Sequence, residues 1–154
     1  CLQQHYALLH TKITKSISTE NNAIETLLAM TQMIVKLEFE VNPTFYKELN
    51  KFYPDLQDGI LENYLEIRKL CIEIIRQGID EGLIRSDIDK DLAWISLRRL
   101  YSGITRDGIY DAYQLPINII IYNTLTLFFR GMCTASGLKT IERFELIHLN
   151  SKNL

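Results

Sequence analysis

Residues 64–104 constrain the fold more than any other part of the chain, and they read YLEIRKLCIEIIRQGIDEGLIRSDIDKDLAWISLRRLYSGI. The pattern predicts a long helix, a break rich in glycine and acidic residues, and a second helix that is apolar or small on nearly every side. One core cannot cover all sides of such a helix. The stretch therefore predicts a helix that packs against a partner, and it favours an assembly module over a self-contained enzyme.

The first of these two helices carries its polar residues in one narrow stripe. They recur at steps of three and four and are Glu62, Glu66, Lys69, Glu73, Arg76 and Asp80. Residues at this spacing share one face of a helix, and the other faces are largely apolar. We therefore expect the central helix of a bundle, with Gly82 as its terminator.

Arg68 interrupts the apolar side of that helix one turn after Tyr64. One interpretation is an arginine that extends to the surface or pairs with an acid, since such side chains are rarely buried unpaired. The other is a polar anchor inside a ligand cavity. The sequence leaves both open.

The break contains three aspartates, Asp87, Asp89 and Asp91, at the spacing that starts a calcium-binding loop. That loop needs glycine at its sixth position and glutamate at its twelfth. Leu92 and Arg98 occupy those positions here. We expect Asp89 to cap the following helix instead.

The helix predicted over residues 92–105 has three faces. A core stripe consists of Ala93, Leu97, Leu100 and Ile104, and an amphipathic flank consists of Trp94, Arg98 and Tyr101. The third face mixes apolar, small and arginine residues: Leu92, Ile95, Ser96, Arg99, Ser102 and Gly103. Small residues allow another helix to approach closely, and arginine is favoured at interfaces. A lightly exposed surface is the alternative for this face.

Residues 112–129 contain no charged side chain, and Pro116 suits the first turn of a helix there. One apolar stripe of this helix consists of Ile117, Ile121, Leu125, Phe128 and Met132. The opposite stripe consists of Ile119, Tyr122, Asn123, Thr126 and Arg130, which a homodimer interface would cover. A transmembrane span is disfavoured because asparagines and threonines fall inside the run.

The remaining pattern is helical as well. We expect a helix over 2–17, a linker over 18–22, a helix over 24–37, a short helix over 44–51 and a short closing helix over 138–149. No useful alternating strand pattern occurs. The fold class is therefore all-α, an antiparallel helical bundle in which residues 1–154 form a single domain.

Composition is consistent with one globular domain that has a real core, because 47% of the residues are hydrophobic and 23% are charged. The net charge of −2 leaves no electrostatic footprint for nucleic acid. Three scattered cysteines indicate reduced thiols and a cytoplasmic protein. The chain begins at Cys1 without an initiator methionine, so we expect an upstream segment.

Catalytic and metal-binding signatures are absent from the sequence. There is no phosphate loop, nucleophile elbow or metalloprotease motif. Cys1 and His5 lie one turn apart, but two ligands do not make a metal site. We expect no catalytic residue, no metal and no cofactor.

The helix order and several short motifs resemble the C-terminal regulatory domain of tetracycline-repressor (TetR) family transcription regulators. The resemblance covers essentially the whole chain. Its carriers are Asn42-Pro43 with Phe45 and Tyr46, Tyr53-Pro54, the segment GIDEGLIR over 78–85, and Asp87-Ile88-Asp89 entering a helix. It implies a homodimer formed through the last two long helices and a small-molecule effector held between the central helices. It also implies that effector binding tilts the helix over 2–17.

Family members bind operator DNA through an N-terminal helix-turn-helix, which this chain lacks. Operator DNA is therefore a partner of the parent protein only. The two other classes that stay open are a helical-bundle enzyme or carrier for an apolar molecule, and an interaction module without ligand.

Two candidate sites follow. The predicted effector pocket combines aromatic walls with two arginines: Phe39, Tyr46, Tyr64, Arg68, Trp94, Arg98 and Tyr101. Two arginines favour an effector with an acidic or strongly accepting group, although the aromatics could equally fill the core. The predicted four-helix dimer interface is drawn from two helices: Leu92, Ile95, Ser96, Arg99, Gly103, Ile119, Tyr122, Asn123, Thr126 and Arg130.

Overall fold

The computed structural model describes the backbone of residues 11, 14–15, 21–40, 57–105, 110 and 112–150. Side chains are described for these residues except 37–40, 57–64 and 149–150. The long helices are α2 (Ala23–Glu40), α4 (Gln57–Asp80), α5 (Lys90–Thr105), α6 (Ile117–Met132) and α7 (Ala135–Asn150). Within the described ranges the only β-type pairing is an isolated bridge between Ile84 and Cys133. The all-α prediction is confirmed.

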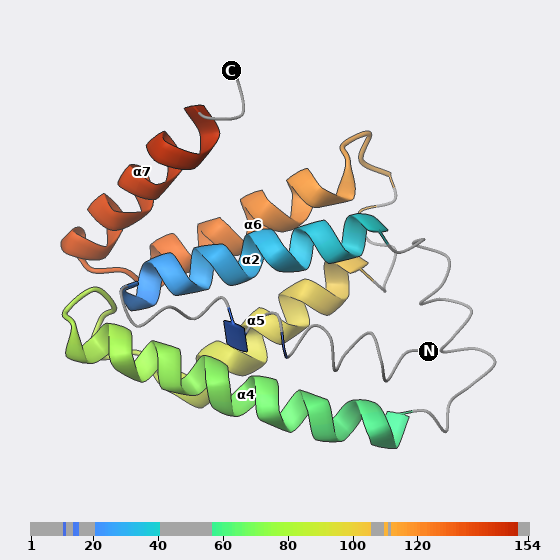
Figure 1. Cartoon of the computed structure of the whole chain (residues 1–154), viewed down its shortest axis with the longest axis horizontal. Coiled ribbons are helices and arrows are strands. Elements are labelled where there is room, and N and C mark those ends of the chain that lie inside the picture. Colours follow the sequence, from blue (N-terminus) through green and yellow to red (C-terminus); the bar gives the residue numbers. More distant parts are fainter. Residues whose placement is uncertain are drawn as a thin grey trace.

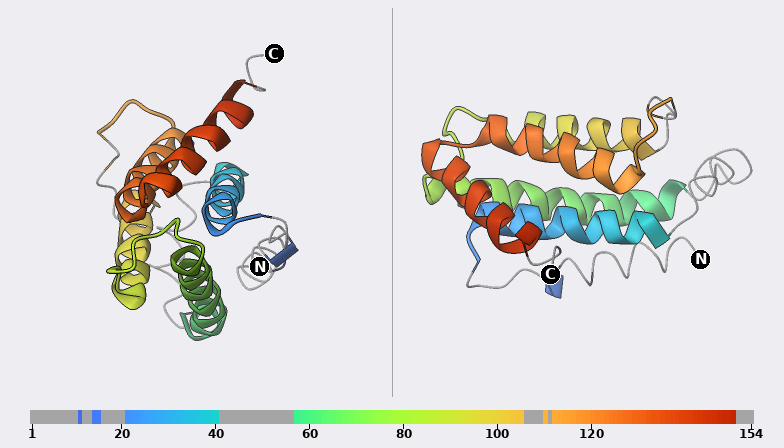
Figure 2. Two further views of the ribbon diagram at one scale, coloured as in Figure 1. Left: turned by 90° about the vertical axis from the view of Figure 1, so that its left-hand side faces the viewer. Right: turned by 90° about the horizontal axis from the view of Figure 1, so that it is seen from above.

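The helices form two layers and a crossing helix. Helices α2 and α4 lie in one layer, α5 and α6 lie in the other, and α7 crosses one end of the bundle (Figures 1 and 2). Helix α2 packs against α4, α6 and α7, whereas α4 packs against α2 and α5. Helix α6 likewise packs against three described helices, α2, α5 and α7. The prediction that the helix ending near Gly82 is central stays a prediction, because the packing of residues 1–10 and 41–56 lies outside the described part of the chain.

Helix α2 can be buried between three other helices because two of its polar side chains are satisfied within the helix. Thr26 and Thr31 are buried, and their hydroxyls donate to the carbonyls of Asn22 and Leu27 at 3.0 and 2.9 Å. A buried hydroxyl with such a bond carries little desolvation penalty. Helix α4, by contrast, leaves Leu65 exposed on its predicted apolar side.

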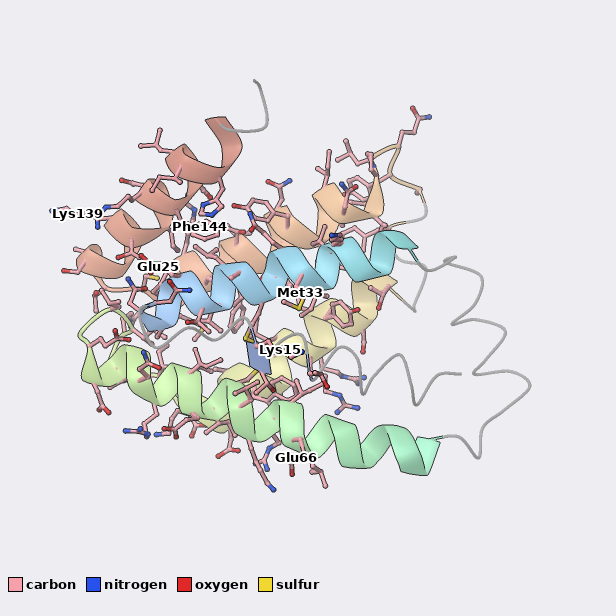
Figure 3. All side chains as sticks on the ribbon, in the orientation of Figure 1. Lys15, Glu25, Met33, Glu66, Lys139 and Phe144 are labelled. Carbon is pink, nitrogen blue, oxygen red and sulfur yellow. The ribbon has the colours of Figure 1, made fainter. Side chains whose placement is uncertain are left out.

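The core draws one or two fully buried aliphatic residues from almost every described element: Ile24 and Leu28 from α2, Ile75 from α4, Ile84 from the α4–α5 turn, Ile121 from α6 and Ile141 from α7. Each such side chain stabilises the fold by about 1.5–3 kcal/mol when buried. The side chains fill the space between the ribbons, and Phe144 and Lys139 mark the inner and outer sides of α7 (Figure 3).

The helix ends follow the predicted capping pattern. The Asp89 carboxylate accepts the Leu92 N–H at 2.8 Å, which confirms Asp89 as the cap of α5. Gly82 has a φ of 73° directly after α4, a conformation that glycine adopts at low cost. Asn22 and Glu25 cap α2 reciprocally, through bonds of 2.9 and 3.3 Å.

Helix α7 begins at Ala135 and is as long as α5 and α6, so the prediction of a short closing helix was wrong. Thr134 caps it, because its Oγ1 accepts the Gly137 N–H at 3.2 Å. The predicted helices over 2–17 and 44–51 lie outside the residues that the structure describes, apart from helical positions at 11 and 14–15.

Candidate functional site

The α4–α5 turn is tied to the α6–α7 junction by a ladder of backbone contacts. The Arg85 N–H donates to Met132 O at 2.9 Å, and the Thr134 N–H donates to Leu83 O at 3.0 Å. The Thr134 hydroxyl also donates to Gly82 O at 2.7 Å. These contacts join segments about fifty residues apart and fix one corner of the bundle, which we call the junction corner.

The start of α2 is held at the same corner. The Glu81 Oε1 accepts the Ala23 N–H at 2.9 Å, which is one of the amides that the first turn of α2 leaves without a helical partner. A carboxylate at a helix N-terminus is favourable because of the helix dipole. The end of α4, the start of α2 and the α6–α7 junction therefore form one connected unit.

The predicted effector set is only partly described. Trp94 is buried in the core, Tyr101 is half-buried and Arg98 is exposed. Arg68 forms an ion pair with Asp91 on α5, with 41% and 62% of the two side chains exposed. Of the two interpretations of Arg68, the surface ion pair is the one present. The side chains of Phe39, Tyr46 and Tyr64 lie outside the described ones.

A polar atom that was not in the predicted set is buried near the start of α6. Asn118 Oδ1 is shielded from solvent and has no hydrogen-bond partner among the described residues. Its position, seven and eleven residues before the buried Leu125 and Phe129, places it on the core-facing side. An unpaired buried acceptor costs about 1–3 kcal/mol, so this oxygen is suited to accept a bond from a bound group. The sequence feature that could have indicated this residue is an asparagine on the apolar side of a helix without charged side chains.

Besides Leu65 of α4, large apolar side chains are exposed to solvent on α5, α6 and α7. Leu92 and Ile95 of α5 are 64% and 51% exposed. On the other two helices the exposed fractions are 41% for Ile119 and 71% for Leu127 of α6, and 64% for Leu146 and 61% for Ile147 of α7. Exposed large apolar side chains that gather on a surface indicate a contact surface, so these helices are candidates for one.

The predicted interface residues of α5 differ in exposure. Arg99 is exposed beside Leu92 and Ile95, whereas Ser96 and Gly103 are half-buried at its edge. This row of residues is directed away from the core residues Ala93, Leu97 and Ile104.

The outward side of α6 differs from the prediction. Thr126 is 4% exposed, so the expectation that the monomer leaves it open was wrong. Tyr122 and Arg130 are half-buried, and Arg130 Nη2 donates to Glu145 Oε2 of α7 at 2.9 Å. Helix α7 packs against α6, and the Arg130–Glu145 ion pair joins the two helices.

The outward line of α6 therefore runs through Ile119, Asn123, Leu127 and Gly131, all exposed and four residues apart. Asn123 Nδ2 donates to the Ile119 carbonyl at 2.8 Å, so its amide group is engaged within the helix. The predicted dimer interface did not include Leu127, although this side chain is 71% exposed.

The pKa values of the buried thiols are raised, which indicates a packed interior and not a reactive one. Burial raises the pKa of the Cys71 thiol to about 12 and that of Cys133 to about 11. Burial, followed by the nearby Glu145 carboxylate, raises the pKa of Tyr122. Buried thiols with raised pKa values are poor nucleophiles.

The described residues show neither a metal-binding cluster nor a helix that could span a membrane. They contain no group of three or more histidine, cysteine, aspartate or glutamate side chains placed to hold a metal ion. No described helix is long and apolar enough to span a membrane.

Comparison with known proteins gives one structural likeness. No protein-family model matches the sequence, and no curated protein does so either. A solved structure, the ketosteroid transcriptional regulator KstR2 of Mycobacterium tuberculosis, is similar with a TM-score of 0.60 and 18% sequence identity. The likeness covers 84% of this chain and 68% of that one. At this identity it shows the fold, which is TetR-like.

Proposed function

We propose that this chain is the effector-sensing and dimerisation domain of a TetR-type transcriptional regulator. The observation that carries the proposal is the set of exposed apolar side chains on α5, α6 and α7, and it includes Leu92, Ile95 and Ile119 of the predicted dimer interface. We define the α6–α7 face as Ile119, Asn123, Leu127, Leu146 and Ile147. Its occupant in this proposal is the same face of a second copy.

The α6–α7 face has the character of a self-complementary surface. Its apolar side chains are neutral, and the exposed charges beside them on α7 include both signs, Lys139 and Arg143 with Glu142. A twofold axis can place acid opposite base on such a surface. A stable dimer of this kind buries at least about 1,000 Å² in total.

The effector in this proposal binds in the interior between the C-terminal half of α2 and the first turn of α6. These helices pack together and run in opposite directions (Figure 1). Asn118 Oδ1 supplies the polar contact, and Trp94 and Tyr101 contribute to the apolar wall. The remaining predicted residues, Phe39, Tyr46 and Tyr64, belong to the same proposal.

The chemistry of Asn118 selects an effector class. An unpaired amide oxygen accepts a hydrogen bond, so the effector is an apolar molecule with a hydroxyl or N–H donor. Arg68 is engaged by Asp91 at the surface, which removes the main reason to favour an acidic effector. The similar regulator is named for ketosteroids, so polycyclic compounds that carry a hydroxyl donor form the first screening set.

Thermal-shift screening with matched variants tests the effector site. An effector at a free concentration of 100 times its Kd raises the free energy of unfolding by roughly 2.7 kcal/mol. Asn118→Leu keeps the size of the side chain and removes the unpaired acceptor, so the free domain should melt at the same or a higher temperature. The shift produced by hydroxylated compounds should fall in this variant.

Two outcomes would contradict different parts of this proposal, the role of Asn118 and the chemical class of the effector. An undiminished shift in Asn118→Leu contradicts the assignment of this residue. Stabilisation by organic acids but not by hydroxylated compounds contradicts the effector class.

DNA binding belongs in this proposal to a part of the parent protein that precedes these residues. The effector then shifts the equilibrium between two arrangements of the bundle, in proportion to its differential affinity for them. The isolated chain should show at best weak, non-specific affinity for duplex DNA, on the order of 10⁻⁴ M at physiological salt. Tight retention of a specific duplex by residues 1–154 alone would contradict this.

A further inference from the structure

A second polar atom of α6 is buried without a hydrogen bond, two turns after Asn118. Thr126 is 4% exposed, and its Oγ1 is shielded from solvent and has no hydrogen-bond partner among the described residues. Burial, followed by Glu145, raises the pKa of the Tyr122 hydroxyl, and Thr126 opposes this shift. The Tyr122 hydroxyl is therefore close to Thr126 Oγ1, but its geometry is not that of a hydrogen bond.

The other buried threonines in the described part of the chain show how unusual this is. Each of them donates its hydroxyl to the carbonyl four residues earlier, at distances between 2.9 and 3.1 Å: Thr26, Thr31, Thr105 and Thr140. Such a bond is the ordinary way to bury a threonine in a helix. Thr126 does not form it, so its hydroxyl is available to a group outside the helix.

The positions of the two unpaired atoms define a distance. Asn118 and Thr126 are eight residues apart on α6, which corresponds to about 12 Å along the helix axis and about 80° around it. The buried Leu125 lies beside Thr126, and Leu125 and Phe129 share the core-facing side with Asn118. An apolar surface of α6 therefore lies between two polar ends.

The helix that packs against this part of α6 carries adaptable side chains. Helix α2 contributes Met30 and Met33 to the core. Met33 projects from α2 into the interior of the bundle (Figure 3). Methionine is unbranched and fills irregular spaces in several rotamers, whereas β-branched side chains are stiff. These two side chains can therefore move aside for a bound molecule.

We propose that the effector is a rigid, elongated, apolar molecule that is held at both ends, by Asn118 Oδ1 and by the Thr126 hydroxyl. This inference rests on the proposed function in one respect, the binding of the effector by Asn118. An amide oxygen only accepts, so the end at Asn118 carries a hydroxyl or N–H donor. A threonine hydroxyl donates and accepts, so the other end carries a hydroxyl or a carbonyl oxygen.

The test compares probes that share one rigid skeleton of four fused saturated rings. The one-ended probe carries a hydroxyl at one end, and the two-ended probe carries a hydroxyl at one end and a ketone at the other. Isothermal titration calorimetry with the whole 154-residue domain measures both affinities. The two-ended probe should bind roughly tenfold more tightly, because it also satisfies the Thr126 hydroxyl. Addition of the ketone to a skeleton of two fused rings should give no such gain, because that molecule cannot reach both ends.

Variants of Thr126 supply the decisive comparison. Thr126→Val keeps the shape and removes the unpaired hydroxyl, so it should melt at the same or a higher temperature and lose the preference for the two-ended probe. Thr126→Ser keeps the hydroxyl and should keep the preference. Thr124→Val is the matched control, because Thr124 is half-buried and lies about 200° away around α6. If Thr126→Val does not fold, Thr126→Ala against Thr126→Ser carries the comparison.

Three results would overturn the inference. They are equal affinity of the unmodified domain for both four-ring probes, an equal gain with the two-ring skeleton, and a preference that Thr126→Val leaves unchanged. The proposed function still stands in these cases if Asn118→Leu weakens binding of the one-ended probe. Binding of that probe that Asn118→Leu leaves undiminished contradicts the effector site itself, and this inference fails with it.

Discussion

Substitution of Gly137 by alanine should destabilise the domain, although alanine is the better helix former. Gly137 is the third residue of α7 and lies against the junction corner. A Cβ at this position would lie 2.1 Å from the Leu83 carbonyl oxygen and 2.9 Å from Cys133 Sγ. The first of these is a backbone atom, so relief requires the α4–α5 turn to move.

The magnitude follows from three opposing effects. Overpacking costs about 1–3 kcal/mol. Leu83 O also accepts the Thr134 N–H, so displacement weakens a bond whose net contribution is about 0.5–1.5 kcal/mol. The gain in helix propensity offsets about 1 kcal/mol of this. We expect a net loss of about 2 kcal/mol, which lowers Tm by roughly 4–8 °C in a domain of this size.

Urea unfolding followed by circular dichroism measures this difference, at one protein concentration because association shifts apparent stability. Gly131→Ala is the matched control. Gly131 also lies in a helix, but a Cβ there meets no atom within 4 Å, so alanine should be neutral or stabilise slightly. Equal stability of the Gly137→Ala and Gly131→Ala variants would refute the argument that this close approach fixes the corner.

Three further changes test other parts of the structure. Glu81→Gln should lower stability by about 0.5 kcal/mol in urea unfolding, because it removes the negative charge that faces the first turn of α2; no change would mean that this contact is not stabilising. Thr126→Glu should unfold the domain rather than dissociate a dimer, since Thr126 is buried within one chain; a folded monomer by circular dichroism and light scattering would contradict this. Stability should fall as pH rises above about 9 towards about 12, because burial keeps the Cys71 thiol protonated in the folded state while the unfolded chain releases its proton. Cys71→Ala should show a smaller loss between pH 8 and pH 10, and an identical loss would assign the effect to other groups.

The sequence was sufficient for the existence of the described long helices and for two of their caps. The row of residues along α5, the Asp89 cap and the Gly82 terminator depend on neighbours in the sequence, and local spacing predicts such features well. The burial of α2 between three other helices was not predictable in this way. Thr26 and Thr31 read as polar, and only the bonds to carbonyls one turn earlier make their burial inexpensive.

The surface of α6 shows the other limit. Thr126 and Leu127 are adjacent in sequence and differ by about 100° around the helix. Which of them is covered depends on where α7 crosses, and that crossing depends on a junction between residues far apart in the chain. The unpaired Asn118 oxygen was unpredictable for the same reason. Whether a side chain finds a hydrogen-bond partner depends on its neighbours in the folded chain.

The mass of the domain in solution tests the central claim most directly. Multi-angle light scattering at micromolar concentration should give twice the chain mass of 17.9 kDa. Leu127→Glu places a charge on the α6–α7 face without disturbing the core, because Leu127 is 71% exposed, and it should reduce the mass to that of one chain. A single-chain mass for the unmodified domain, or a dimer that Leu127→Glu leaves intact, would contradict the account.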